Sequence, residues 1–219
     1  MTTPARIAVL LAVALLVASA AGCRTAYYNM WETLGKEKRH LLKDNVEDAQ
    51  ESQEKAGEQF QDALTRIQEM YGFEGGDLEK AYRKLNAEYE SSVARAEDVR
   101  RRIRDVEQVA KDLFREWERE IDEIQNRELR ANSSRQLRET QQRYDRLHAA
   151  MTRAERSMDP VLRQLNDYVL YLKHNLNAAA VGSLKQEAGQ IEQQVQTLVA
   201  DIRRSVEEAQ RFVKTFEEK

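Results

Sequence analysis

Apolar residues recur at alternating steps of three and four along most of the chain from Tyr28 onward. This spacing is typical of helices that pack in a coiled-coil-like bundle. The first run extends to about Tyr71, and Gln53 interrupts it with a polar side chain. Gly72 and the pair Gly75-Gly76 then predict a helix end and a turn. The apolar positions of this run are Ala49, Ala56, Phe60, Ala63, Ile67 and Met70.

A second run follows Asp77, a good helix N-cap, and keeps its register as far as Ala131. The phase then slips, because the next seam begins six residues later at Leu137. Asn132-Ser133-Ser134 lies in this gap, and its middle residue forms a capping box with Gln136. We therefore expect a turn or kink there; the alternative is one very long helix with a local register adjustment. The second seam contains Tyr82, Leu85, Tyr89, Ala96, Val99, Ile103, Val106, Ala110, Leu113, Trp117 and Ile124, with polar breaks at Ser92 and Glu120.

A third run extends from Ser134 to about Leu176 and contains Asp159-Pro160. Proline removes a backbone donor, but the apolar phase is the same on both sides, so we expect a kink and not a break. Asn175-Leu176-Asn177 predicts the helix end, and Asn177 or Ser183 is expected to cap a last helix. The last seam contains Leu184, Ala188, Ile191, Val195, Leu198, Ile202, Ala209, Phe212 and Phe216.

These runs predict an all-α fold: an elongated, antiparallel, coiled-coil-like bundle over residues 28–219. It would have four long helices, or three if the second and third are fused. Charged residues make up 33% of the chain and aromatic residues 7%, which favours a narrow apolar seam over a broad core. The formal net charge of −3 argues against a general nucleic-acid binder.

The N-terminus has the pattern of an export signal. Arg6 is followed by the apolar segment Ile7–Ala18, which is shorter than the roughly 20 residues of a membrane-spanning helix. Ala20-Ala21-Gly22-Cys23 resembles a bacterial lipobox, with Ala20 at the place where leucine is usual. This resemblance implies cleavage between Gly22 and Cys23 and lipidation of Cys23, the single cysteine. The alternative is an ordinary secretory signal in which this cysteine is incidental.

The lipobox interpretation divides the chain into a cleaved signal peptide (1–22), a lipidated N-terminus (23–27) and the bundle domain (28–219). A covalent lipid on Cys23 would be the membrane anchor, and no other cofactor is expected. Arg24 differs from the aspartate that retains lipoproteins in the inner membrane. Resemblance to lipoprotein sorting therefore favours the outer membrane, with the bundle in the periplasm.

Four segments resemble the family catalogued as domain of unknown function 2959, whose members are predicted bacterial lipoproteins. The resemblance covers nearly all of the mature chain and implies a helical envelope protein. It supplies no activity. The segments are Tyr28–Glu32 with Lys38-Arg39, Ala49–Glu54, Leu113–Trp117 and, as the most specific, Val169–Ala178.

Two pairs have the Glu-x-x-His type of spacing used in ferritin-like metal bundles: Glu37 with His40, and Asp145 with His148. Asp145 and His148 fall outside the third seam and should face solvent, and chance matches are common in so acidic a chain. We expect no metal site. We expect no catalytic residues either, because the sequence contains no nucleophile motif such as Gly-x-Ser-x-Gly.

Tyr171, His174, Asn175 and Asn177 form the densest group of polar and aromatic residues, at the expected tip of the bundle next to Tyr168. A ligand or partner contact is one interpretation. The other is a helix end whose polar groups satisfy free backbone carbonyls.

A basic run, Arg100-Arg101-Arg102 with Arg104, lies among acidic residues. This pattern favours a solvated helix face with internal ion pairs, and contact with anionic lipid or cell-wall polymer is the alternative. The terminal Lys219 raises one more hypothesis, covalent attachment to the cell wall.

The sequence therefore favours a lipid-anchored structural or protein-interaction module of the bacterial envelope, with an unidentified protein partner and no enzymatic activity. The alternative is a bundle that binds a small or lipidic ligand between its helices. Pairing of two chains stays open, because residual seam area could serve an oligomer as well.

Overall fold

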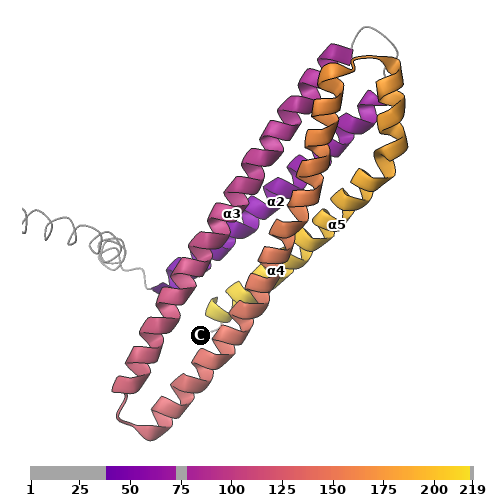
Figure 1. Ribbon diagram of the computed structural model, residues 1–219. Coiled ribbons are helices and arrows are strands. Elements are labelled where there is room, and N and C mark those ends of the chain that lie inside the picture. The colour runs from indigo at the N-terminus through magenta and orange to yellow at the C-terminus, as the bar shows by residue number, and fades with distance from the viewer. Residues whose placement is uncertain (1–37, 73–77, 218–219) are drawn as a thin grey trace, which may run out of the picture. The chain divides into compact units, whose positions relative to one another are not determined.

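The computed structural model describes residues 38–72 and 78–217. Four long helices follow one another there, and no strand occurs in these two ranges: α2 (Lys38–Met70), α3 (Leu78–Glu123), α4 (Arg127–His174) and α5 (Ala178–Glu217). The chain divides into two units after Leu41, and the second unit, residues 42–219, is the bundle described below. Its helices alternate in direction and lie side by side (Figure 1). The all-α bundle is thus confirmed, with four helices and not three.

Several sequence predictions lie outside the described residues. They are the signal peptide with Gly22 and Cys23, the helical start at residues 28–37, the turn at Gly75-Gly76, the Asp77 cap and the terminal Lys219.

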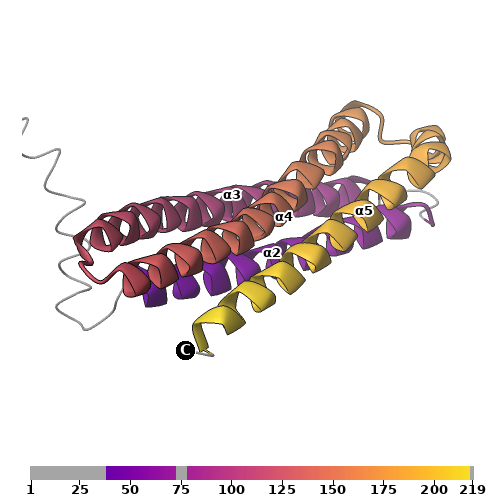
Figure 2. The same cartoon turned by 90° about the horizontal axis from the view of Figure 1, so that it is seen from below.

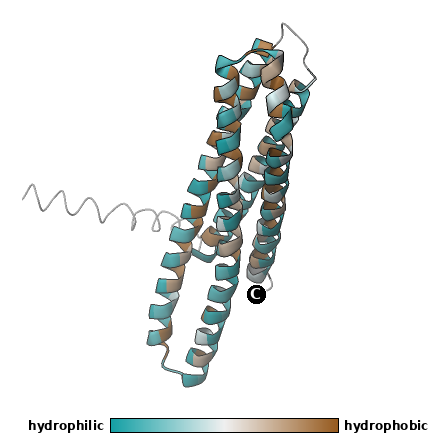
Figure 3. Ribbon diagram, turned by 45° about the vertical axis from the view of Figure 1, so that its right-hand side comes forward, coloured by the Kyte–Doolittle hydropathy of each residue, from teal (hydrophilic) through white to brown (hydrophobic). Residues whose placement is uncertain are grey.

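The core follows most of the predicted seam positions, but Tyr82, Tyr89 and Ile124 are only half-buried. Ile121 is buried in place of Ile124, which lies in the turn after α3. Hydrophobic positions lie mostly on the sides of the helices that face one another, and hydrophilic positions lie on the outer sides (Figure 3). The apolar side chains at the inner positions are buried, as expected of amphipathic helices. Burying one such large side chain stabilises a fold by about 1.5–3 kcal/mol. The largest fully buried ones are Phe60, Phe212, Leu42, Ile67, Met70, Leu85, Leu147, Met151, Met158, Leu165, Leu172 and Ile191.

The turn between α3 and α4 lies at residues 124–126, so the prediction of a turn or kink at Asn132–Ser134 is wrong. The Asn126 side chain caps α4, because its Oδ1 accepts from the backbone N–H groups of Glu128 (2.9 Å) and Leu129 (3.1 Å). The Arg130 guanidinium donates to the carbonyl of Ile124 at 2.8 and 2.5 Å and so satisfies the end of α3. The alternative of one continuous helix is also wrong.

Asn132–Ser134 is instead regular helix within α4. The Ser134 hydroxyl donates to the carbonyl of Arg130 (2.8 Å), and Ser133 Oγ accepts from the indole N–H of Trp117 (2.9 Å). Ala131 is exposed, so the apparent continuation of the second seam to this residue has no counterpart in packing. The phase slip reflects the start of a new helix at Arg127, ten residues before the first buried residue of α4, Leu137.

The other end of α4 is as predicted. The helix continues through Pro160 and ends at His174, and its axis curves along its C-terminal half (Figure 2). The backbone N–H of Asn175 donates to the carbonyl of Leu172 (3.2 Å). Asn177 caps α5, because its Oδ1 accepts from the N–H of Ala180 (2.9 Å). Of the two predicted caps, it is therefore Asn177 and not Ser183.

Candidate functional site

The predicted tip residues lie where α4 turns into α5. The side chain of Asn175 donates to the carbonyl of Tyr171 (2.9 Å), and Asn177 holds the start of α5. These two amides act as helix ends, as the second interpretation expected. Tyr171 and His174 remain exposed at this turn.

Large apolar side chains are exposed at the same turn. Leu170 is 49% exposed, Tyr171 40% and Leu176 41%. We call residues 170–177 the tip. Within the described ranges the remaining large apolar residue of this exposure is Leu129 (59%), in the first turn of α4 at the opposite end of that helix. A small apolar group gathered at one turn is a feature of contact surfaces.

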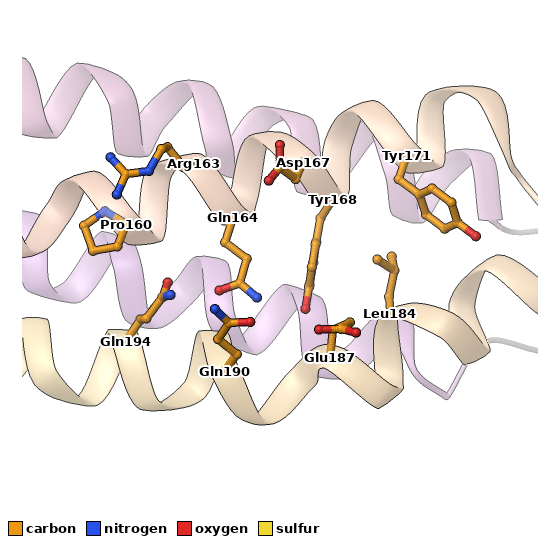
Figure 4. Close-up of a pocket in the computed structure, with 10 residues that line it drawn as sticks. All are labelled: Pro160, Arg163, Gln164, Asp167, Tyr168, Tyr171, Leu184, Glu187, Gln190 and Gln194. Atoms are coloured by element: carbon orange, nitrogen blue, oxygen red, sulfur yellow. The ribbon is translucent and has the colours of Figure 1, made fainter.

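Next to the tip, a groove of about 510 Å³ lies between α4 and α5. The side chains of Gln164 and Tyr168 reach from α4 toward α5, while Gln190 and Gln194 reach from α5 toward α4 (Figure 4). We call this the α4–α5 groove. It is lined by Pro160, Arg163, Gln164, Asp167, Tyr168, Tyr171, Leu184, Glu187, Gln190 and Gln194.

Several polar atoms of this groove are buried without a hydrogen-bond partner in the described part of the chain. They are the hydroxyl of Tyr168 and the Oε1 atoms of Gln164 and Gln194. The hydroxyl of nearby Tyr71 is also buried without a hydrogen-bond partner there. Tyr168 is only 4% exposed. A buried polar group without a partner costs about 1–3 kcal/mol, so such groups are rare in native structures and are free to pair with water or a ligand.

The two tyrosines keep their protons. Burial raises the pKa of Tyr168 and that of Tyr71, and in Tyr71 the neighbouring Tyr168 raises it further. Gln164 and Tyr71 are close enough to Tyr168 to affect its pKa, yet neither completes a hydrogen bond of good geometry with it. Both hydroxyls can therefore donate one hydrogen bond and accept another at neutral pH.

A second buried polar set lies nearer the middle of the bundle, and there the groups are paired. Gln53, 1% exposed, donates through Nε2 to the carbonyl of Met151 (3.3 Å) and accepts through Oε1 from the Ser205 hydroxyl (2.6 Å). The Ser157 hydroxyl donates to Asp201 Oδ2 (2.6 Å). These contacts join α2, α4 and α5, and we call these residues the polar waist.

The polar waist continues onto α3. The Ser52 hydroxyl donates to Asp98 Oδ2 at 2.6 Å, and this hydrogen bond is the main reason why the pKa of Asp98 lies below its ordinary value. Arg101 and Arg102 lower it further by their charge, while partial burial opposes them. The interruption of the first seam at Gln53 thus marks a buried polar connection and not a defect.

Three arginines of the basic run form ion pairs, and two of them pair with other helices. Arg100 donates to Glu155 (2.9 Å) and Asp159 (2.5 Å), Arg102 to Asp48 (2.9 Å), and Arg101 to Asp98. The pairing expected within one helix is found for Arg101 with Asp98, whereas Arg100 and Arg102 pair with acidic residues of α4 and α2. Arg104 is exposed.

His148 is more covered than the sequence predicted. Its Nε2 lies 2.6 Å from Glu107 Oε1, and its ring stacks on Tyr144 with centroids 5.8 Å apart. Asp145 faces solvent as expected. Burial and the charge of Glu107 raise the pKa of Tyr144.

His40 is exposed, and its suggested partner Glu37 lies outside the described residues. Within residues 38–72 and 78–217 no three His, Cys, Asp or Glu side chains come together as metal ligands would. The same ranges contain no helix with an apolar stretch sufficient to cross a bilayer.

The sequence suggested Tyr168 and Tyr171 but missed the glutamines of the groove. Gln164, Gln190 and Gln194 lie off the apolar seam, and the first half of α5 is rich in glutamine, so no local signal separates these three from the others. The register of α4 against α5 is what brings them together.

Fold and groove define an antiparallel four-helix bundle protein with an exposed apolar tip and a partly unsatisfied polar groove beside it. The profile of the family described as protein of unknown function (DUF2959) matches residues 27–216, and the chain belongs to this family. The resemblance drawn from the sequence is thereby confirmed. Neither the curated proteins nor the solved structures compared with the chain gave a match.

Proposed function

We propose that this protein is a lipid-anchored module of the bacterial envelope, which docks a protein partner through its tip. The observation that carries the anchor is Cys23, the single cysteine, placed directly after Ala20-Ala21-Gly22 and a short apolar segment. Acyl chains on this residue would hold the chain at a membrane, since each buried methylene contributes about 0.8 kcal/mol. The absence of an aspartate at Arg24 favours the outer membrane and a periplasmic bundle.

The tip supports the docking part of the proposal. Leu170, Tyr171 and Leu176 each expose apolar surface within the tip, and the hydrogen bonds of Asn175 and Asn177 fix the backbone there. Tyrosine is enriched at the centre of protein interfaces. Anchoring raises the effective concentration of the tip near partners in the same membrane. The proposal includes no reaction and no cofactor besides the covalent lipid.

The anchor is tested by metabolic labelling with an alkyne fatty acid. We expect label on the wild-type chain and an N-terminal peptide that begins with acylated Cys23. Cys23→Ser should carry no label and keep its signal peptide. A wild-type chain that is unlabelled and cut at another bond would contradict the anchor.

Docking is tested separately with a photo-crosslinking amino acid at Leu170 or Leu176. Leu129 is the matched control, since it is equally apolar and exposed at the opposite end of α4. We expect one envelope protein to be trapped from the tip positions and not from position 129, and the product to be lost in Cys23→Ser. The same products from all three positions, or none, would refute a docking tip.

A second candidate function, ligand binding between helices, is favoured by a different observation: the unpaired polar atoms of the α4–α5 groove.

A further inference from the structure

We propose that the α4–α5 groove binds a short, uncharged saccharide. The groove is of suitable size, because its volume of about 510 Å³ lies within the range of roughly 300–1,000 Å³ that small-molecule sites occupy. This inference rests on neither Cys23 nor the docking role of the tip.

The polar atoms of the groove favour a ligand that carries hydroxyl groups. The buried oxygens of Gln164 and Gln194 need donors, while the buried hydroxyl of Tyr168 can donate and accept. Rotating either amide by half a turn exchanges the atom that lacks a partner, but a ligand hydroxyl serves both orientations. An ammonium group can only donate, and a phosphate oxygen or carboxylate mostly accepts. A polyhydroxylated ligand therefore fits the groove best.

Charge excludes a strongly ionic ligand. Arg163 supplies one positive charge, and Asp167 and Glu187 supply two negative charges, so the lining is slightly acidic. An anion would meet net repulsion. A compact cation would leave the arginine and most of the amides without a role. The same three charged groups are well suited to hold neutral hydroxyls through charge-assisted hydrogen bonds.

Apolar surface closes the groove toward the tip. Tyr171 is 40% exposed, and Leu184 faces it from α5 (Figure 4). An aromatic ring with a leucine opposite offers a flat apolar surface for the C–H face of a pyranose ring, while hydroxyls at the ring edge reach the glutamines. Buried polar groups together with one aromatic platform make a site for a saccharide and not for an acyl chain.

The test uses the purified full chain in detergent with four probes: chitotriose and maltotriose as neutral saccharides, spermidine as a cation and inorganic phosphate as an anion. Binding is measured by titration calorimetry and by saturation-transfer NMR. We expect at least one saccharide to bind and neither ion to compete with it. Failure of both saccharides to bind, or displacement of a bound saccharide by spermidine or phosphate, would overturn the proposal.

Variants locate the binding. Tyr168→Phe removes one hydroxyl and keeps the ring, and Gln194→Leu removes one amide at similar volume. Each should weaken saccharide binding about tenfold, the loss of one good hydrogen bond in a buried site. Gln196→Leu is the matched control, because Gln196 is an exposed glutamine of the same helix outside the groove.

Stability separates a ligand site from a structural one. Because the removed atoms have no partner within the described residues, Tyr168→Phe and Gln194→Leu should leave the thermal midpoint of the free protein unchanged or raise it. Weaker binding without lower stability supports the site. Equal binding by wild type, Tyr168→Phe and Gln194→Leu would place the saccharide elsewhere and refute the groove.

Discussion

The polar waist and the α4–α5 groove bury the same kinds of side chain with opposite results. At the waist, Gln53 uses its amide nitrogen on Met151 and its oxygen on Ser205. In the groove, the oxygens of Gln164 and Gln194 are buried without a partner in the described part of the chain. Both regions lie between helices of one bundle, so burial alone does not explain the difference.

The comparison shows that polar residues between helices can either stabilise the bundle or remain available to bind another molecule. A paired group adds about 0.5–1.5 kcal/mol and disfavours other helix registers, since a shift would break the pair. An unpaired group lowers stability and keeps its hydrogen-bonding capacity for another molecule. Stability measurements should therefore distinguish the two regions more clearly than inspection of residue types.

The largest expected effect is the loss of Gln53. Gln53→Ala should lower the free energy of unfolding by about 2–4 kcal/mol, because it leaves a cavity and frees both the Ser205 hydroxyl and the Met151 carbonyl. Gln194→Ala in the groove should change it by less than about 1 kcal/mol, because no pair is broken. Urea unfolding followed by circular dichroism measures both. Equal losses of unfolding free energy in Gln53→Ala and Gln194→Ala would contradict the proposed difference between the polar waist and the groove.

A double substitution tests whether the waist acts through pairing. Ser205→Ala alone should cost about 1–2 kcal/mol, since it leaves Gln53 Oε1 buried and unpaired. Gln53→Leu with Ser205→Ala should recover most of that loss, since both polar partners are gone. The same unfolding assay gives the coupling energy. Strictly additive losses would show that the two residues do not act as a pair.

The double variant also tests register. If the pair disfavours other packings, its removal should produce additional oligomeric species in size-exclusion chromatography with light scattering. A single species identical to the wild type would limit the waist to a contribution to stability.

Alkaline pH should affect the groove. Because burial raises the pKa of Tyr168 above its ordinary value of 10.0, the folded state keeps a proton that the unfolded state loses. The free energy of unfolding is therefore unaffected by the ionisation of this group below pH 10. It falls as pH rises above 10, by up to about 1.4 kcal/mol per pH unit. Tyr168→Phe should lose less stability between pH 9 and pH 11 than the wild type in urea unfolding. Identical losses would contradict the role of burial.

The smallest effect concerns Asp98. Ser52→Ala removes the hydrogen bond that most lowers its pKa, so that pKa should rise toward the ordinary value of 3.8, which NMR titration can follow. Unfolding at neutral pH should become easier by about 0.5–1.5 kcal/mol. This difference should vanish as pH falls through the pKa of Asp98 in the folded wild type, because the carboxyl is then neutral in both proteins. Ser91→Ala, at an exposed serine of α3, is the control.

The sequence predicted what depends on local periodicity and capping. Alternating steps of three and four revealed the seams, the matching phase around Pro160 indicated a continuous helix, and Asn177 was recognised as a cap. The turn capped by Asn126 was missed, because Asn132-Ser133-Ser134 offered a stronger local signal a few residues later. Nothing in the sequence shows that Ser133 instead accepts from Trp117, since that contact needs two antiparallel helices in place.

The candidate site was predicted only in part for the same reason. Tyr171 and the asparagines of the tip stood out as a compact segment of sequence. The groove requires Gln164 on α4 to face Gln190 and Gln194 on α5, and this depends on the register between two helices. Whether a buried glutamine oxygen is paired, as in Gln53, or unpaired, as in Gln194, depends on its neighbours in space.

The end of the bundle around Trp117 has a consequence for the evolution of length. Among the residues that the structure describes, Trp117, Ile121 and Leu137 form a cluster with Phe114 whose members come from α3 and α4, and Asn126 closes the turn beyond it. Inserting seven residues into each of these two helices would add two turns and keep every apolar side chain on its own face. The α3–α4 hairpin can thus be lengthened or shortened in matched heptads while the waist and the groove stay unchanged. Natural relatives can vary the reach of this end without redesigning the rest of the molecule.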